Sequence, residues 1–317
     1  MDTIALPAGA TSRAPRLDDA PRILEFVAGY NTRIVGFADY TLDDVRNELI
    51  EPGFNLDTDG WLVLDGTGAI VGYGWALGSS DGDMVDVDVV APDPEVGTWL
   101  LDRALGRARE IGRSRGHGRV TIDKGVYRRD EIARALVSAR GFAVGTTYHR
   151  MRIDHDGPVA TPEPPEGVTL RDGTDEAARR AGYEVMTAAF ADHFGEVATP
   201  YADWAALRES RSTFDWAQLT VLSHNGEPVA VCECTDQFVE DEGCGYVLKI
   251  GVLPEARGHG HARYLLRRTF ALDAAAGRAG TLLHVDTNNT TPALGLYESV
   301  GMRPVMVIDV WRAELLV

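Results

Sequence analysis

Residues 246–266 read YVLKIGVLPEARGHGHARYLL, and this stretch decides the fold. The run from Tyr246 to Leu253 is apolar, contains three β-branched residues and ends at Pro254, which is typical of a buried strand. After a short loop, apolar residues recur at helical spacing: Ala262, Leu265, Leu266, Phe270 and Ala274. The stretch therefore predicts a strand, a loop with two glycines and a helix in direct succession.

The loop, residues 257–262 with the sequence RGHGHA, has the properties of an anion site. The first amides of a helix have no intrahelical acceptor, and the aligned peptide dipoles make that end partly positive. Gly258 and Gly260 carry no Cβ atom that would keep an anion away, and Arg257 adds a positive charge. We therefore expect the loop to bind a pyrophosphate group. The alternative is a tight strand-to-helix turn in which the glycines are incidental.

Two other phosphate-binding motifs do not fit the loop. A Walker loop ends in Gly-Lys-Ser or Gly-Lys-Thr, which is absent here, and a dinucleotide fingerprint requires a glycine three residues after Gly260, where Arg263 stands. The wider pattern favours a different class of anion loop.

Two spaced patterns surround and follow the loop. The first is Val252-x-Pro254-x-x-Arg257-Gly258-x-Gly260-x-Ala262, and the second is Asn289-x-x-x-Ala293-x-x-x-Tyr297-x-x-x-Gly301-Met302. The first resembles the Arg/Gln-x-x-Gly-x-Gly/Ala signature of the GNAT acyltransferase family, and the second is similar to that family's last helix and following strand. The resemblance covers the C-terminal half of the chain. It implies an acyl-coenzyme A site, with acetyl-coenzyme A as acyl donor and no metal, in which the pyrophosphate contacts Arg257, Gly258, His259, Gly260, His261 and Ala262.

The chain contains an internal repeat of one module. Trp61 to Ala76 aligns without a gap with Leu219 to Cys234 at an offset of 158 residues, and both segments read as strand, glycine turn, strand. A proline-rich segment at 156–167 reads as a linker between the halves. We therefore expect an α/β protein of two tandem GNAT-like modules, residues 1–155 and 168–317. Each module is expected to be a mixed, mainly antiparallel twisted sheet flanked by helices.

The two copies differ at the anion loop. Pro92 and Leu101 lie nine positions apart, whereas the matching Pro254 and Leu266 lie twelve apart. In the N-terminal copy the glycine loop is replaced by DPEVGTW at 93–99, where a proline has no amide hydrogen and two acids repel phosphate. We therefore predict that the N-terminal module does not catalyse.

Two further positions bear on that prediction. Trp99 fills the emptied groove or is an ordinary core residue, and the sequence leaves both open. At an offset of 160 residues Tyr297 corresponds to Val137, which has no proton to donate. The N-terminal module is then a scaffold, a lid or a wall of the acceptor pocket.

The GNAT resemblance also implies where acyl transfer takes place. The thioester carbonyl and the pantetheine chain are expected at the backbone of Ile250, Gly251 and Val252, where the central strand of the family separates from its neighbour. Gly251 allows close approach of a ligand or marks a bulge. By the same resemblance Tyr297 is the general acid that protonates the departing thiolate, and a core role is the alternative.

The general base is less determined by the sequence. Some GNAT members use a carboxylate on the strand that leads to the acyl site, but residues 246–249 here read YVLK and contain no acid. Glu233, on the preceding strand between two cysteines, is the leading substitute if its side chain faces a cleft and not water. Asp236 is a second candidate, and a chain of water molecules is a third.

The acceptor pocket is expected from the first helices of the C-terminal module. Asp192 and His193 lie in the aromatic and charged segment FADHFG and are candidates to contact a polar acceptor, unless Gly195 only ends a helix. Asn288 and Asn289 bind the pantetheine amides or make the turn before the last helix. Arg263 and Arg267 reach a further phosphate or belong to a solvated helix face.

Composition limits the classes of partner. The 317 residues carry a net charge of −17, which argues against nucleic acid or an anionic membrane as the main partner. The N-terminus lacks the pattern of a secretory signal, and no apolar run reaches the ~18 residues of a membrane span. The three cysteines, Cys232, Cys234 and Cys244, form no zinc pattern and are expected as free, mostly buried thiols in a cytoplasmic protein.

The sequence thus predicts an N-acetyltransferase that uses acetyl-coenzyme A and acts on a primary amine of a small molecule. The C-terminal module carries the reaction by direct attack. A protein that binds or senses the coenzyme without turnover is the alternative, and the missing strand carboxylate favours it. The identity of the acceptor and the presence of a homodimer stay open.

Overall fold

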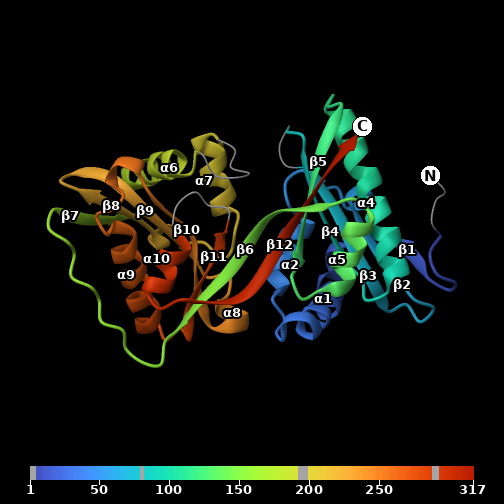
Figure 1. Cartoon of the computed structure of the whole chain (residues 1–317), viewed down its shortest axis with the longest axis horizontal. Coiled ribbons are helices and arrows are strands. Elements are labelled where there is room, and N and C mark those ends of the chain that lie inside the picture. The colour runs from blue at the N-terminus through green and yellow to red at the C-terminus, as the bar shows by residue number, and fades with distance from the viewer. Residues whose placement is uncertain (1–4, 79–81, 192–198, 288–292) are drawn as a thin grey trace. The chain divides into compact units, whose positions relative to one another are not determined.

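The structure is a computed structural model that describes residues 5–78, 82–191, 199–287 and 293–317 (Figure 1). The chain forms two compact units. The first comprises residues 1–148 together with 306–317, and the second comprises residues 149–305. Each unit combines helices with β-strands.

The strands of the first unit are arranged in the order β1-β2-β3-β4-β5-β12, where β12 spans Arg303–Leu316. Its pairs are antiparallel except for β4 and β5, which are parallel. The elements are β1 (Thr11–Arg13), α1 (Ala20–Val35), α2 (Leu42–Leu49), α3 (Leu56–Asp59), β2 (Gly60–Leu64), β3 (Ile70–Gly78), β4 (Met84–Val90), α4 (Pro94–Ser114), β5 (Arg119–Tyr127) and α5 (Glu131–Ala139).

The second half of the chain repeats the order of elements of the first, apart from one short helix that stands at a different place in each half. The strands of the second unit are arranged β6-β11-β10-β9-β8-β7; β10 and β11 are parallel, whereas the pairs β10–β9, β9–β8 and β8–β7 are antiparallel. The remaining elements of the chain are β6 (Ala143–Asp154), β7 (Val168–Asp172), α6 (Glu176–Phe190), α7 (Tyr201–Glu209), β8 (Leu219–His224), β9 (Glu227–Thr235), α8 (Val239–Glu242), β10 (Cys244–Val252), α9 (His261–Ala275), β11 (Gly280–Asp286), α10 (Ala293–Ser299) and β12 (Arg303–Leu316). The predicted repeat of an α/β module is therefore confirmed.

The central parallel strands separate partway along their length in both units. β10 pairs with β11 from Cys244 opposite Gly280 to Val247 opposite Leu283, and β4 pairs with β5 only as far as Asp86 opposite Asp123. The register of β10 against β9 also shifts between Val247 and Lys249, which is a β-bulge. A bulge bends a strand and increases its twist. Here it lies where β10 leaves β11.

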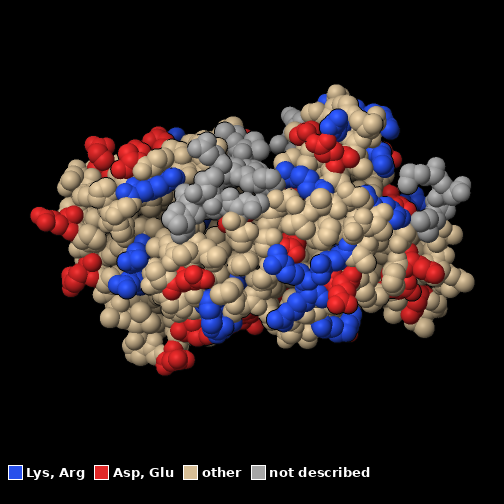
Figure 2. All heavy atoms as spheres, in the orientation of Figure 1, with Lys and Arg blue, Asp and Glu red and all other residues tan. Residues whose placement is uncertain are grey.

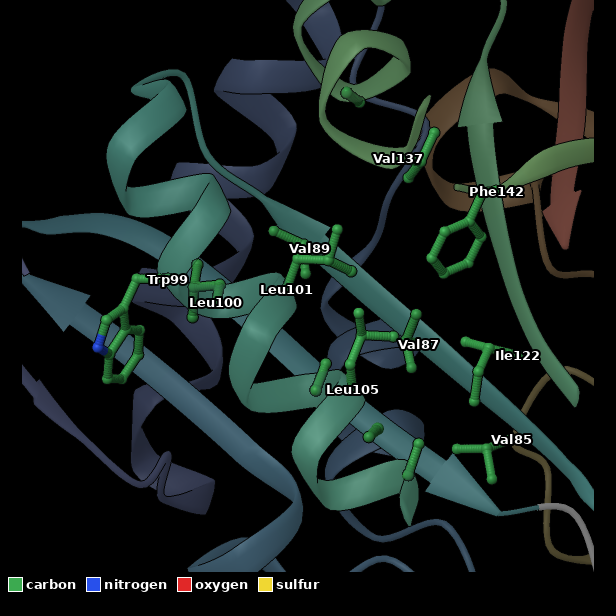
Figure 3. Close-up of a cluster of buried hydrophobic side chains, with 14 of the residues drawn as sticks. Val85, Val87, Val89, Trp99, Leu100, Leu101, Leu105, Ile122, Val137 and Phe142 are labelled. Carbon is green, nitrogen blue, oxygen red and sulfur yellow. The ribbon is translucent and has the colours of Figure 1, made fainter. Parts of the chain in front are cut away.

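In each unit helices cover both faces of the strands, so side chains that point to either face are buried. In the second unit α6 and α7 lie on one face and α9 and α10 on the other (Figure 1). Figure 3 shows the cluster between α4, α5 and the sheet of the first unit. Leu100 and Leu101 are fully buried there, and each contributes about 1.5–3 kcal/mol of hydrophobic stabilisation.

Trp99 and Val137 both belong to this cluster (Figure 3). Trp99 is 5% exposed and lies beside Leu100 near the start of α4. Of the two interpretations that the sequence left open, ordinary core packing is the one that the structure supports. Val137 is fully buried on α5 at the place that matches Tyr297.

The division into units differs from the predicted modules of residues 1–155 and 168–317. Residues 306–317 belong to the first unit because β12 runs antiparallel to β5 from Ile308 opposite Tyr127 to Leu316 opposite Arg119. Conversely, the second unit begins at His149, within β6. Residues 156–167, the predicted linker, contain neither helix nor strand.

The predicted thiols are free, and Cys232 and Cys244 are buried while Cys234 is partly buried. The sulfurs of Cys232 and Cys234 are 3.8 Å apart, as expected for two residues on the same face of a strand. Lys and Arg side chains lie among Asp and Glu side chains on the surface shown in Figure 2. Within the part of the chain that the structure describes, no helix is both long enough and apolar enough to cross a bilayer.

A buried carboxylate in the first unit gives a prediction about stability. Glu48 of α2 accepts a 2.9 Å hydrogen bond from the Tyr40 hydroxyl and another from the Tyr73 hydroxyl. Burial raises the pKa of Glu48 from 4.5 to about 7; the Tyr73 hydroxyl opposes this shift, and Asp88 adds to it. The folded protein therefore keeps this proton at pH values where the unfolded chain has lost it.

We expect the free energy of unfolding to fall by up to about 3 kcal/mol as the pH rises from about 4.5 to about 7, because the folded state then binds more protons than the unfolded state. Glu48→Gln should remove most of this fall. Denaturant unfolding at a series of pH values measures it, and Glu51→Gln is a control that should keep the wild-type slope. An unchanged slope in Glu48→Gln would contradict the assignment.

Candidate active site

The predicted anion loop joins β10 to α9 through a short 3-10 turn, η3 (Pro254–Ala256). Gly258 and Gly260 have φ values of +82° and +81°, a conformation that glycine adopts without steric cost. A Cβ atom added at either glycine would meet nothing within 4 Å, so both positions face open space. Gly260 is the N-cap of α9 and gives the helix no side-chain cap.

The amides of this loop are available to a ligand. The first helical hydrogen bond of α9 runs from the Tyr264 amide to the Gly260 carbonyl, and the Arg257 amide bonds to Pro254. The six amides that lie between Arg257 and Tyr264 in the sequence, those of residues 258–263, donate to no acceptor among the described residues. Six unpaired N–H groups at a helix N-terminus form an anion-binding surface.

The side chains of the loop add to this surface. Arg257 is exposed, and its guanidinium donates to the carbonyls of Val252 (3.2 Å) and Ala189 (3.5 Å), which holds it beside the end of β10. His261 is 3% exposed and lies 3.3 Å from His224, measured between Nε2 and Nδ1. Burial, followed by the nearby His224 and His259, lowers the pKa of His261. The His261 side chain is therefore held neutral.

The matching helix of the first unit begins differently. The carboxylate of Asp93 caps α4 by accepting a 2.8 Å hydrogen bond from the Glu95 amide, and Pro94 supplies no amide hydrogen. The N-terminus of α9 in the second unit has no side-chain cap, whereas the N-terminus of α4 in the first unit is capped by the carboxylate of Asp93.

Gly251 has a packing role in the structure. A Cβ atom at this position would lie 2.9 Å from the Cβ of Ala189 and 3.0 Å from the ring of Phe190, so glycine allows α6 to approach β10. The bulge lies at Leu248 and not at Gly251. Ile250, Gly251 and Val252 all lie beyond Val247, the last residue of β10 that pairs with β11. Their backbones border the gap between the two strands.

Tyr297 lies on α10 and is 8% exposed, in the apolar cluster formed with α9 and β10. Its hydroxyl bonds to no partner among the residues that the structure describes. Burial, with a smaller contribution from the Cys232 thiol, raises the pKa of Tyr297. The phenol therefore stays protonated, and its hydrogen is available to an acceptor that enters the cluster.

Glu233 faces the side of the sheet that α6 and α7 cover, opposite to the side on which Tyr297 lies. It is fully buried, and Arg208 of α7 donates a 2.8 Å charge-assisted hydrogen bond to its Oε2. Its Oε1 is buried and bonds to no described residue. On the question left open by the sequence, Glu233 therefore faces the interior of the unit and not water.

A cavity of about 400 Å³ adjoins this carboxylate. Aromatic side chains of Tyr183, Trp204 and Phe214 line it, together with Arg208 and the cross-strand neighbour of Glu233, Lys249. Cavities with apolar walls and a few converging polar groups are the usual form of small-molecule sites. The sequence alone did not identify Arg208 or its ion pair with Glu233.

The remaining candidates divide into two groups. Asp236 is not part of the cavity wall. Its Oδ1 accepts hydrogen bonds from Gln218 (2.7 Å) and Arg278 (2.5 Å) instead. Arg263 donates to Ser299, and Arg267 is exposed. Asp192, His193, Asn288 and Asn289 lie outside the described residues. No cluster of three or more His, Cys, Asp or Glu side chains able to hold a metal occurs in the described ranges.

These features, two α/β units with separated central strands and an open helix N-terminus after one of them, define the class of protein. The family model described as "Acetyltransferase (GNAT) family" matches residues 181–302. The mycothiol acetyltransferase of Geodermatophilus obscurus is 31% identical over 263 residues, which are 79% of this chain and 81% of that protein. The chain belongs to the GNAT acetyltransferase family.

Two further similar proteins match different shares of the chain. The mycothiol acetyltransferase of Thermomonospora curvata is 32% identical over 60% of this chain, and the match spans 66% of that protein, slightly less than two thirds. The crystal structure of a GCN5-related N-acetyltransferase from Sphaerobacter thermophilus has a TM-score of 0.84 and 25% identity. It covers 99% of this chain and is covered to 98%, so the likeness includes both units of the tandem.

Proposed function

We propose that the protein is an acetyl-coenzyme A-dependent N-acetyltransferase whose C-terminal unit acetylates a primary amine of a small molecule. The observation that carries the proposal is the row of six unpaired amides at residues 258–263, beside Arg257 and at the start of α9. These groups bind the pyrophosphate. The first unit has an internal cap at the same place, which supports one coenzyme site per chain.

The gap between β10 and β11 positions the acyl group. When bound, acetyl-coenzyme A supplies an activated thioester. The backbone of Ile250 to Val252 borders the gap and orients the carbonyl by hydrogen bonding. Tyr297, neutral at physiological pH, holds the proton that the leaving sulfur needs. Asn288 and Asn289 are proposed as partners of the pantetheine amides.

The amine reaches the carbonyl from the cavity beside Glu233. The free Oε1 of Glu233 accepts a proton from the incoming ammonium, directly or through water, while Arg208 fixes the carboxylate through Oε2. The aromatic walls bury the apolar part of the acceptor. The names of the relatives, mycothiol acetyltransferases, support a small-molecule acceptor. Asp192 and His193 are proposed to complete its binding, and cytoplasmic location and a homodimer stay predictions.

The test is an assay for release of free thiol from acetyl-coenzyme A with a panel of small amines. We expect at least one amine to raise the rate above that of buffer. A protein that senses the coenzyme without turnover is the second candidate, favoured by the engagement of Glu233 with Arg208. That candidate prevails if calorimetry detects coenzyme binding while every amine leaves the rate at the buffer level.

Replacement of the proposed base gives a third measurement. Glu233→Gln should lower kcat about 100-fold or more, because the amide keeps the shape of the carboxylate but does not take up a proton. Glu227→Gln, on the exposed start of the same strand, is the matched control and should leave kcat unchanged. Since the change also leaves Arg208 without its counter-ion, thermal unfolding must accompany the kinetics. A normal kcat in folded Glu233→Gln would assign proton removal to water.

A further inference from the structure

The first unit contains a cavity of about 240 Å³ that the proposed reaction does not use. It is lined by residues of α1, β3, β4 and β5 and by the start of α5. Figure 1 shows where these elements lie in the fold. It lies beside the point where the central parallel strands separate, since pairing of β4 with β5 ends at Asp86 and the cavity is lined by Asp88 and Lys124. The acceptor cavity of the second unit has the same relation to its strands, through Leu248 and Lys249.

The hydroxyl hydrogens on the wall of this cavity are directed to carboxylates. Tyr30 donates to Asp130 at 2.6 Å, and Tyr127 donates to Asp39 at 2.6 Å. The other two tyrosines on the wall, Tyr40 and Tyr73, donate to Glu48 as described above. A phenol has one hydrogen, so the wall offers a ligand oxygen acceptors in place of hydroxyl donors.

The charges on the wall of this cavity also favour a ligand that donates hydrogen bonds and carries a positive charge. Asp39, Asp88 and Asp130 line the cavity against one cation, Lys124, which leaves a net charge of −2. Lys124 is 3% exposed, and its ammonium already donates to Asp88 at 2.5 Å and to the Val89 carbonyl at 3.2 Å. Charges in such partly enclosed sites act through a lower dielectric than in water, so an anion is disfavoured.

Asn31 of α1 gives independent evidence for a ligand. It is 5% exposed and lines the cavity, and its side-chain amide bonds to no described residue. Buried side-chain amides are normally hydrogen-bonded, so this group is expected to find its partner inside the cavity. An inorganic ion fits less well, because no metal-binding cluster of three carboxylate, imidazole or thiol groups occurs among the described residues.

We propose that this cavity binds a small organic cation with an ammonium group, such as a short alkyl diamine. The N–H donors bond to the carboxylates and phenol oxygens, the tyrosine rings contact the alkyl chain and stabilise the charge, and Asn31 accepts one further hydrogen. The small volume excludes a drug-sized ligand, for which 300–1,000 Å³ is usual. The first unit is then a ligand-binding module and not only a scaffold.

The experiment is titration calorimetry of the full chain with 1,4-diaminobutane, and with butyrate as an anion of similar length. The wild type should bind the diamine and not butyrate. Asp39→Asn and Asn31→Leu should each weaken binding at least tenfold. Asparagine tolerates the left-handed φ of +46° at residue 39, which makes the first variant conservative. Asp57→Asn, an exposed aspartate of the same unit outside the cavity, is the control and should bind as the wild type does.

Thermal unfolding of each variant distinguishes loss of the site from loss of the fold. The proposal is overturned if the wild type gives no heat with the diamine or binds butyrate equally well. It is also overturned if both cavity variants bind the diamine as tightly as the wild type, because the ligand then lies elsewhere, for example beside Glu233. Failure of catalysis in the second unit would not affect any of these outcomes.

Discussion

Gly260→Asp is expected to weaken acetyl-coenzyme A binding by at least about 100-fold. The new carboxylate would lie at the N-cap of α9, next to the unpaired amides, and would repel the pyrophosphate. Two unit charges 4 Å apart interact by about 4 kcal/mol at an effective dielectric of 20, which is more than the 2.7 kcal/mol of a 100-fold change. The carboxylate would also cap the helix itself, as Asp93 does for α4.

The substitution changes backbone strain as well as charge, and two further variants separate these causes. Gly260→Ala tests only the cost of a side chain at φ +81°, about 1–2 kcal/mol, and Gly260→Asn adds a neutral capping group of the same shape as aspartate. Calorimetry should rank binding as wild type, then alanine or asparagine, then aspartate. Equal losses for asparagine and aspartate would show that charge is irrelevant, and unchanged binding in aspartate would remove the pyrophosphate from this loop.

The sequence could predict this loop because its determinants are local. Gly258 and Gly260 need no distant partner to adopt positive φ, and the helix that follows leaves its own amides open. The repeat was equally accessible, since hairpins such as Trp61–Ala76 depend on turn glycines and alternating apolar residues. These local rules recovered the order of elements in both units.

Contacts between residues distant in the sequence were not accessible in the same way. The Glu233–Arg208 pair joins residues 25 positions apart, and no pattern in either segment identifies its partner. The pairing of β12 with β5 joins residues almost 200 positions apart, so the sequence did not reveal that the last strand pairs with β5 of the first unit. Gly251 shows the same limit, because only the structure reveals that α6 fills the space beside it.

A second large effect is expected from Tyr297→Phe, which should lower kcat by about 100- to 1,000-fold while leaving the affinity for acetyl-coenzyme A within about twofold. Phenylalanine keeps the ring in its apolar cluster and removes only the hydroxyl, whose hydrogen has no partner among the described residues. Thiol-release kinetics at saturating coenzyme, with calorimetry for binding, separate the two effects.

The pH profile distinguishes an acid from a packing residue. Burial raises the pKa of Tyr297 above its ordinary value of 10, so the wild type should lose no activity through ionisation of this phenol up to at least pH 9. The same shift makes the phenol a weaker acid, so its hydrogen bond to the leaving sulfur must strengthen as negative charge develops there. Tyr264→Phe, a buried tyrosine of α9 in the same cluster, is the matched control. If both variants lose kcat equally, the cluster contributes through packing; if neither does, the proton comes from solvent.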